Sequence, residues 1–322
     1  MIYLRFFLLL CLFPLFLSTP LLANENQQKK LAYIVSDLSI PYWQITQRGI
    51  LSQGMKLAYA IQTYNSSNSA KKELEAVVQA INDKVDGIII SPTSSSACAT
   101  VLKLAKEANI PVVICDIGTQ EGEYVSYISS DNKSGAYQIG KVLADFLKNK
   151  VWQEGRVGII AIPQKRINGK ERTAGFMQAL EEAGIKGGGI KQQITFSYEE
   201  TYEYAKELIA NTPDLRAIWL QGSDKYKGAL QAIKESKKQD EIALLCFDAE
   251  PEFLEMIPRG EIVVVGMQQP FLMGEKSVQV MYEHLLGNKV EKNIQLPILS
   301  VDAKVIEKLL PTIKRNVLGM DK

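Results

Sequence analysis

The chain has 322 residues, of which 46% are hydrophobic and 23% are charged, a balance typical of a soluble globular protein. Its 37 basic and 36 acidic side chains nearly cancel, and no region is strongly basic, which excludes an electrostatic basis for binding nucleic acid. A chain of this length exceeds what one hydrophobic core usually serves, so two lobes are expected.

The first residues have the layout of a secretory signal. Arg5 is the one charge before Ala23, and an apolar run at 6–17 is followed by Ser18-Thr19-Pro20. This run is shorter than the ~20 residues that a membrane-spanning helix needs. We therefore expect residues 1–23 to be a signal peptide that is cleaved after Ala23, and the mature protein to be exported to the periplasm.

From residue 31 on, apolar runs typical of buried strands alternate with amphipathic stretches typical of helices. Strands are expected first at 31–36, 60–64, 86–90 and 111–115, and then, after a restart, at 156–161, 190–195, 216–220, 242–246 and 262–266. Helices are expected at 42–58, 69–84, 95–108 and 132–149, and then at 169–184, 199–211, 223–237 and 270–287. This alternation predicts an α/β protein with two doubly wound parallel-sheet lobes, each covered by helices on both faces.

Two local patterns fall outside the regular alternation. The run Gly187-Gly188-Gly189 follows an expected helix and precedes an expected strand, which indicates a helix-to-strand turn rather than a phosphate loop. At the other end of the chain, Val301 to Lys314 is typical of an extra helix, and Lys314 to Lys322 of a polar tail. We expect the extra helix to pack back onto a lobe.

Polar and aromatic side chains gather beyond the carboxyl ends of the expected strands, where open parallel sheets bind ligands. In the first unit these residues are Ser36, Asp37, Tyr42, Trp43, Ser91, Thr93 and Asp116. In the second unit they are Asn168, Glu171, Arg172, Phe196, Gln221, Gly222, Ser223, Asp224, Asp248 and Gln268. Carboxylates, arginine and amides can bind paired hydroxyl groups, and aromatic rings can stack on the C–H face of a sugar. The set therefore indicates a carbohydrate site.

Each of these residues has a structural alternative. Tyr42 and Trp43 suit the start of a buried helix, and we expect one ring in the site and leave the other open. Arg172 lies in a mixed-charge stretch that usually forms a solvated helix face, and a carboxylate such as Asp116 or Asp248 can cap a helix. Because one such carboxylate ends a strand in each unit, a shared ligand is favoured.

The sequence contains no motif of an enzyme, a metal site or a cofactor site. His284 is the single histidine, and neither a Gly-x-Ser-x-Gly elbow nor a Walker loop occurs. Two carboxylates facing each other would suit a glycosidase, an alternative that the residues alone leave open. Cys115 and Cys246 end apolar runs and are expected as small buried residues, while a disulfide among them and Cys98 stays open.

Six segments, in this order and at this spacing, resemble the periplasmic sugar-binding proteins of the ribose-binding type, which are related to the effector domain of lac-repressor-like regulators. They are SDLSIPYW at 36–43, DGIIISP at 86–92, ANIPVV at 108–113, ISSDN at 128–132, KERTAGF at 170–176 and FD at 247–248. The resemblance runs from about Lys30 to about Pro297, nearly the whole mature chain.

The resemblance implies two lobes that close on one sugar across a three-crossing hinge. The N-terminal lobe would comprise 30–131 plus 269–297, and the C-terminal lobe 132–268 plus 298–322 with the extra helix. The crossings are expected near 130–133, 248–251 and 268–271. A protein of this type is not an enzyme, and we expect a monomer that delivers a small carbohydrate or polyol to an inner-membrane ABC permease. The alternative is a sensory protein that docks on a membrane histidine kinase or chemoreceptor.

The resemblance also implies roles for individual residues. Those that match ligand positions of the family in type, or nearly so, are Ser36, Tyr42, Trp43, Asp116, Arg172, Phe196, Asp248 and Gln268. Ser91, Ile40 and Gly222 stand where the ribose binders have asparagine, and Ile117 stands in place of an arginine. Serine at 91 weakens one hydrogen bond, and the other three departures remove donors. This indicates a ligand with fewer hydroxyl groups than ribose or a different shape, including a furanosyl signal molecule. Asp37 has no counterpart and is expected to supply a replacement acceptor.

Overall fold

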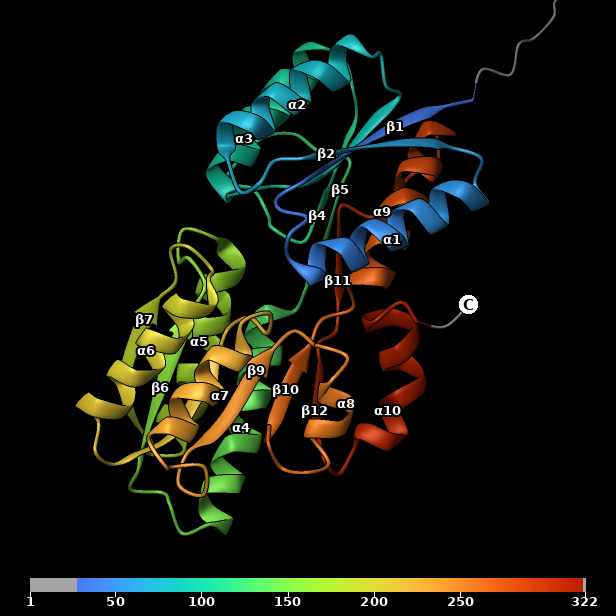
Figure 1. The fold of residues 1–322 in the computed structure, drawn as a ribbon. Coiled ribbons are helices and arrows are strands. Elements are labelled where there is room, and N and C mark those ends of the chain that lie inside the picture. The colour runs from blue at the N-terminus through green and yellow to red at the C-terminus, as the bar shows by residue number, and fades with distance from the viewer. Residues whose placement is uncertain (1–27, 321–322) are drawn as a thin grey trace, which may run out of the picture.

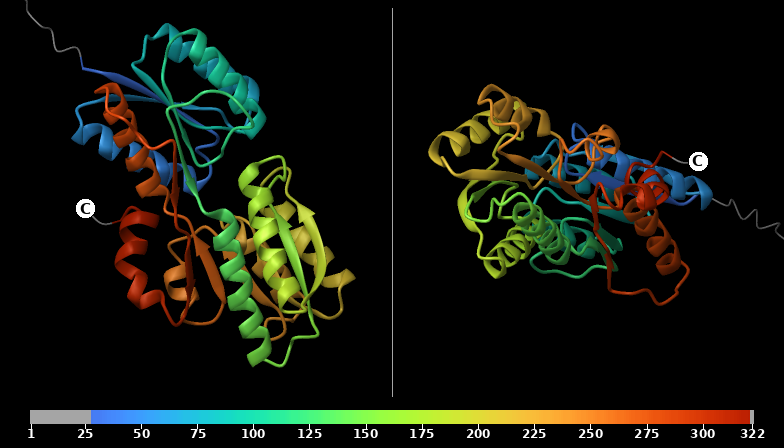
Figure 2. Two further views of the ribbon diagram at one scale, coloured as in Figure 1. Left: turned by 180° about the vertical axis from the view of Figure 1, so that it is seen from behind. Right: turned by 90° about the horizontal axis from the view of Figure 1, so that it is seen from below.

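The computed structural model describes residues 28–320, so the expected signal peptide and its cleavage site lie outside the described residues. Within this range the chain forms two α/β lobes, each built on a six-stranded sheet. The lobes lie one above the other in Figure 1, and the chain segments that join them run along one side of the molecule (Figures 1 and 2).

In the N-terminal lobe every pair of neighbouring strands is parallel, in the order β11-β5-β4-β3-β1-β2. The strands are β1 (Lys30–Val35), β2 (Ala60–Asn65), β3 (Gly87–Ser91), β4 (Val112–Cys115), β5 (Ser126–Ser130) and β11 (Asn293–Leu296). One face is covered by α1 (Pro41–Lys56) and α9 (Pro270–Leu285), and the other by α2 (Ala70–Asn82) and α3 (Ser95–Glu107). Successive residues of β1 alternate between these layers: Tyr33 packs with α1 and α9, and Ile34 with α2 and α3.

The C-terminal lobe repeats this plan in the order β12-β10-β9-β8-β6-β7, except that its edge strand β12 is antiparallel to β10. The strands are β6 (Arg156–Ala161), β7 (Lys186–Gln192), β8 (Leu215–Leu220), β9 (Ala243–Phe247), β10 (Val264–Met267) and β12 (Leu299–Asp302). One face carries α4 (Asn132–Asn149) and α5 (Ile167–Glu182). The other carries α6 (Tyr198–Asn211), α7 (Tyr226–Glu235), α8 (Phe253–Met256) and α10 (Ile306–Thr312).

The predicted doubly wound α/β architecture is confirmed, and each expected strand and helix occurs within a few residues of its predicted place. The short strands β5, β11 and β12 were not predicted, because about half of their residues are polar and they form no apolar run. The helix α8 was not predicted because it has only four residues. The expected turn at the triple glycine run is wrong, because these residues are part of β7. The pairing of β7 with β6 shifts its register there, and Gly189 has a φ of +116°. The turn itself is made by Gly184, with a φ of +70°.

The chain crosses between the lobes three times: from β5 to α4, from β10 to α9, and from β11 to β12. The crossing expected near 248–251 is therefore wrong, since the residues on both sides of it belong to one core of the C-terminal lobe. The third crossing lies instead at 297–298, because β11 adds an edge strand to the first sheet before β12 returns to the second. The lobe limits of 30–131 plus 269–297 and 132–268 plus 298–322 stay a prediction.

The C-terminal segment differs from the expected helix and polar tail. It begins with β12, continues as α10 and ends in a π-helical turn, η1 (Ile313–Val317), whose residues Ile313 and Val317 are buried in the core of the C-terminal lobe. The same segment also contacts the N-terminal lobe. Arg315 Nη2 lies 2.7 Å from Glu275 Oε2 on α9, and Arg48 on α1 donates a 2.7 Å hydrogen bond to the carbonyl oxygen of Leu318. The segment thus joins the lobes beside the hinge (Figure 1).

Two further properties concern residues 28–320. The three cysteines in this range, Cys98, Cys115 and Cys246, are buried free thiols, as expected for small core residues, and no disulfide joins them. No helix of this part of the chain is long and apolar enough to cross a membrane.

Helices α1 and α9 approach so closely that their backbones touch. A Cβ atom on Gly49 would lie 2.1 Å from the carbonyl oxygen of Phe271, and one on Gly274 would lie 2.3 Å from that of Thr46. Glycine at both positions is therefore what allows α9, which directly follows a hinge crossing, to dock on α1.

We expect Gly49→Ala to lower the free energy of unfolding by about 1–3 kcal/mol through this backbone overlap. In an uncrowded helix the same change would raise stability by about 0.5–1 kcal/mol, so the sign of the effect is diagnostic. Urea unfolding followed by circular dichroism measures it. Gly187→Ala in β7 is the control for an added methyl group without steric overlap, because nothing lies within 4 Å of its added Cβ. A Gly49→Ala protein as stable as the parent would contradict the tight crossing.

Candidate functional site

A cavity lies between the carboxyl ends of the two sheets and is lined by residues of both lobes. From the N-terminal lobe these are Ile40, Tyr42, Trp43 and Asp116. The others are Ile162, Arg166, Asn168, Arg172, Gln193, Phe196, Gly222, Asp224, Asp248 and Gln268. The volume is about 50 Å³, which is room for a few water molecules. The cavity is therefore narrow, with the two lobes in contact beside it.

Most of the residues predicted from the sequence meet in this cavity, including both Tyr42 and Trp43. Seven of them do not line it: Ser36, Asp37, Ser91, Thr93, Glu171, Gln221 and Ser223. Asp37 Oδ1 accepts a 2.9 Å hydrogen bond from the backbone N–H of Ser39, so it shapes a turn instead of supplying the expected replacement acceptor. Ser91 is fully buried and shares a 3.1 Å hydrogen bond with the Tyr33 hydroxyl, and Ser36 is buried at the end of β1.

Arg172 is a deeply buried charge of the cavity, with a side chain only 3% exposed. Its Nε donates to Asn132 Oδ1 at 2.8 Å and its Nη1 to the carbonyl oxygen of Gln221 at 2.7 Å. The guanidinium also stacks 3.9 Å from the centroid of the Phe247 ring. These contacts exclude the alternative that Arg172 lies on a solvated helix face, and they hold its positive charge in one position.

Asp248 follows β9 and lies next to this charge, with Oδ2 at 3.8 Å from Arg172 Nη1. Desolvation by burial raises the pKa of Asp248 to about 6, although Arg172 and a 2.6 Å hydrogen bond from Gln268 Nε2 both act to lower it. Gln268 Oε1 is buried and accepts no hydrogen bond from the described protein atoms. Asp248 and Gln268 together thus offer the cavity acceptor atoms that a hydroxyl group can use.

Asp116 occupies the equivalent place after β4 in the N-terminal lobe. Its Oδ1 accepts a 3.0 Å hydrogen bond from the Tyr42 hydroxyl, and the ring of Tyr42 meets that of Trp43 edge to face at 4.9 Å. Burial raises the pKa of Asp116, and the nearby Arg172 opposes this rise. Neither Asp116 nor Asp248 is the N-cap of a helix, so the capping alternative for both is wrong.

Phe196 is presented to the cavity by a capping box at the start of α6. Ser197 Oγ accepts from the backbone N–H of Glu200, and the Glu200 carboxylate in turn accepts from the backbone N–H of Ile194, Thr195 and Phe196. This holds Phe196 at a φ of +54°, a conformation that costs a bulky residue roughly 1–3 kcal/mol. The surrounding hydrogen bonds offset that cost and keep the ring in the cavity wall.

Three cavity residues were not identified from the sequence: Ile162, Arg166 and Gln193. Gln193 was placed inside a strand expected at 190–195, whereas β7 ends at Gln192, which makes Gln193 the first residue beyond the strand. Arg166 precedes both the expected helix at 169–184 and α5, which begins at Ile167, so it is a loop residue in either case. A more exact strand end would have revealed Gln193, whereas only the contacts of Arg166 reveal its place in the cavity.

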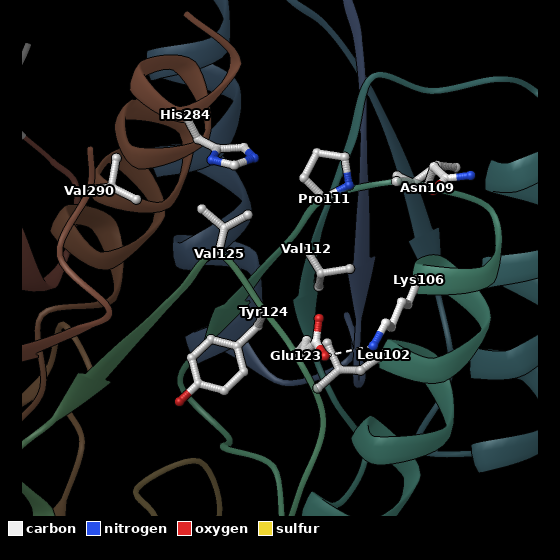
Figure 3. A pocket seen from close by; sticks show the side chains of 11 residues that line it. Leu102, Lys106, Asn109, Pro111, Val112, Glu123, Tyr124, Val125, His284 and Val290 are labelled. Atoms are coloured by element: carbon white, nitrogen blue, oxygen red, sulfur yellow. Dashed lines mark hydrogen bonds and ion pairs between the residues drawn. The ribbon is translucent and has the colours of Figure 1, made fainter. Parts of the chain in front are cut away.

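Larger cavities lie elsewhere, away from the carboxyl ends of the strands. One of about 520 Å³ is at the amino-terminal edge of the first sheet, where His284 lies near Val125, and where the charges of Lys106 and Glu123 pair with each other at 2.6 Å (Figure 3). Another of about 660 Å³ is at the corresponding edge of the second lobe. Within residues 28–320 no group of three or more His, Cys, Asp and Glu side chains could hold a metal ion.

The fold and the cleft have counterparts among known proteins. A family described as the periplasmic binding protein domain matches residues 31–289. The chain belongs to this family. This periplasmic binding protein is 29% identical over 297 residues to the ribose import binding protein RbsB of Escherichia coli, covering 91% of this chain and 95% of that relative. It is 22% identical over 291 residues to the D-allose-binding periplasmic protein of Escherichia coli, covering 87% and 91%.

Solved structures agree on the fold. A carbohydrate transporter solute binding protein from Agrobacterium radiobacter, in complex with D-arabinose, superimposes with a TM-score of 0.83 at 22% identity, covering 91% of this chain and 99% of that one. A protein from Mycobacterium smegmatis in complex with β-D-fucofuranose gives a TM-score of 0.82 at 17% identity, covering 91% and 97%. The periplasmic binding protein thus has the two-lobed fold that the sequence predicted.

We expect Asp248→Asn to weaken ligand binding while stabilising the ligand-free protein near neutral pH. Because the pKa of Asp248 is raised from 3.8 to about 6 in the fold, its contribution to stability is greatest below pH 4 and is lost as the pH rises towards 6. The variant avoids this loss, so its stability advantage over the parent should grow between pH 4 and 6. Loss of the charged acceptor should raise Kd by more than tenfold, because a hydrogen bond to a charged group contributes about 1.5–3 kcal/mol of binding free energy.

Thermal unfolding at several pH values and titration calorimetry measure the two effects. His284→Ala is the control, since this residue lines the cavity at the opposite edge of the first sheet. A pH-independent stability difference, or an unchanged Kd, would show that Asp248 is not the buried acceptor described above.

Proposed function

We propose that this periplasmic binding protein closes its two lobes on one small carbohydrate or related polyol and delivers it to an inner-membrane ABC transporter. The observation that carries the proposal is the cavity between the lobes, in which carboxylates, guanidinium groups and aromatic rings converge. The names of the relatives, which include import binding proteins for ribose and fructose, support the same class of ligand.

The chemistry of the cavity suits a sugar. Asp116 and Asp248 accept hydrogen bonds, and Arg172 donates them, in positions fixed by other contacts. Tyr42 and Phe196 add apolar ring surface, which stacks on the C–H face of a sugar ring. Buried polar groups in fixed positions discriminate strongly between similar sugars, because a ligand that lacks a matching hydroxyl group leaves them without a hydrogen-bond partner.

The ligand differs from ribose in its number or placement of hydroxyl groups. Ile40 and Gly222, which stand where the ribose binders have asparagine, both line the cavity. The isoleucine side chain has no hydrogen-bond donor and glycine has no side chain, so the donors that two asparagine side chains would supply are missing. A deoxy sugar or a furanosyl compound with an apolar edge fits this wall better than ribose does.

Several properties complete the proposal. The protein acts as a monomer after cleavage of its signal peptide behind Ala23, and it catalyses no reaction. Delivery to a permease is preferred to docking on a membrane sensor, because relatives are named as import proteins and no observation on the described residues favours sensing.

A thermal-shift screen of pentoses, hexoses, deoxy sugars, polyols and furanosyl compounds tests the proposal. A ligand that binds only the folded protein stabilises it by about 2.7 kcal/mol at a hundredfold excess over Kd, so at least one compound should raise Tm clearly. The protein is first unfolded and refolded to remove any ligand carried through purification. A broad panel without a single shift would contradict sugar binding.

We expect Gly222→Asn to raise the affinity for ribose and to lower that for the ligand found in the screen. The change adds an amide to the cavity wall with little strain, since the new Cβ meets its nearest neighbours at 3.8 Å, an ordinary contact distance. One added hydrogen bond is worth about 0.5–1.5 kcal/mol, or roughly two- to tenfold in Kd. Gly222→Ala, which adds the Cβ without the amide, is the control. Equal ribose affinity in all three proteins would mean that this position does not select the ligand.

A further inference from the structure

Arg166 connects the two lobes at the mouth of the cleft. It precedes α5 in the C-terminal lobe and is 6% exposed. Its Nη2 donates a 3.0 Å hydrogen bond to Asn68 Oδ1, and its Nε donates a 3.3 Å hydrogen bond to the carbonyl oxygen of Thr93. Both acceptors belong to the N-terminal lobe, in the turns after β2 and β3. The next residue, Ile167, adds a third contact between the lobes, from its backbone N–H to Ser95 Oγ at 3.4 Å.

The acceptors on the N-terminal lobe are held in place by their own contacts. Asn68 has a φ of +57° and donates its backbone N–H to the carbonyl oxygen of Ser36 at 2.6 Å. The backbone N–H of Thr93 donates to the carboxylate of Glu73, which is completely buried. The rim that receives Arg166 is therefore fixed before the lobes meet.

The guanidinium is held equally well from its own side. Its central carbon lies 5.6 Å from the centroid of the Phe196 ring, which the capping box of α6 keeps in place. Burial lowers the pKa of Arg166 to about 10, and the nearby Asp116 carboxylate opposes this change, so the side chain stays charged at neutral pH. A charge that is desolvated in this way gains more from each hydrogen bond than an exposed one.

The same guanidinium also lines the ligand cavity, together with Asp116 on the opposite lobe. One side chain therefore touches both the ligand space and the rim of the other lobe. The hydrogen bonds to Asn68 and Thr93 can form only when the lobes are together, because donor and acceptors belong to different lobes. Their free energy is thus available to the closed form and not to the open form.

We propose that Arg166 is a latch for lobe closure: a positioning residue that joins the rim of the N-terminal lobe to the ligand cavity and so sets how strongly ligand binding is coupled to closure. The proposal rests on the proposed function only in that a ligand occupies this cavity. When the binding-competent form is a fraction of the population, the apparent Kd is the intrinsic Kd divided by that fraction. Weakening the latch therefore raises Kd even where no ligand contact is removed.

Asn68→Ala and Arg166→Ala separate the latch from direct ligand contact. Asn68→Ala removes an acceptor at the rim and alters no residue that lines the cavity, whereas Arg166→Ala removes both roles. Arg156→Ala is the control: this half-buried arginine pairs with Asp214 at 3.2 Å within the C-terminal lobe. Circular dichroism and thermal unfolding establish that each variant is folded.

The position of the lobes is measured by electron–electron double resonance between spin labels on Lys71→Cys and Lys170→Cys, two exposed positions on opposite lobes. The natural cysteines of the described chain are buried, so the new ones are labelled selectively. We expect both latch variants to shift the distance distribution of the protein without added sugar towards the open form, and Arg156→Ala to leave it unchanged. For Asn68→Ala, Kd for the sugar found in the screen should rise by the factor by which the closed fraction falls, and for Arg166→Ala by more.

Unchanged distance distributions in both latch variants would overturn the proposal. So would a raised Kd in Arg166→Ala alone, with an unchanged distribution and an unaffected Asn68→Ala, since Arg166 would then be a ligand contact and nothing more. The distance measurement needs no sugar. A failed ligand screen would therefore contradict the proposed function while the latch is still decided by the distributions.

Discussion

The buried guanidinium of Arg172 is the fixed charge on which the arrangement of the cleft depends. A desolvated charge is tolerated in a protein only when hydrogen bonds and counter-charges surround it. The hydrogen bonds and the counter-charge around Arg172 come from Asn132, the backbone of Gln221 and the carboxylate of Asp248, and the ring of Phe247 stacks on the guanidinium. These partners lie at the start of α4 and at the ends of β8 and β9, so the position of one side chain draws the ends of three elements of the C-terminal lobe to one place.

Three residues that line the cavity have left-handed backbone conformations. Asp116, Phe196 and Asp248, which all line the cavity, have φ values of +73°, +54° and +67°. Left-handed conformations are costly for residues other than glycine, least so for aspartate, and the rest of the fold must hold them. Asp116 and Asp248 directly follow a strand, and Phe196 lies in the turn before α6, so each is at a sharp bend of the chain. The strained backbone positions are therefore residues that line the cavity.

The lobes are joined on both sides of this space. Beside the hinge, the C-terminal segment is anchored in the core of the C-terminal lobe and binds the other lobe through Arg315 and the carbonyl oxygen of Leu318. At the mouth of the cleft, Arg166 makes the corresponding contacts. Motion between the lobes is then governed by three chain crossings and by these two sets of polar contacts, which can break and reform as the hinge moves.

The sequence by itself determined the two doubly wound lobes, because apolar periodicity is a local property that survives without tertiary contacts. It also identified Tyr42, Asp116, Arg172 and Asp248, since the carboxyl ends of parallel strands converge wherever the strands are correctly placed. The tertiary structure alone decided what depends on distant partners: that the third crossing follows β11, and that Arg166 reaches the opposite lobe. Short polar strands and a single arginine in a loop carry no periodic signal, so only the contacts that they make reveal their roles.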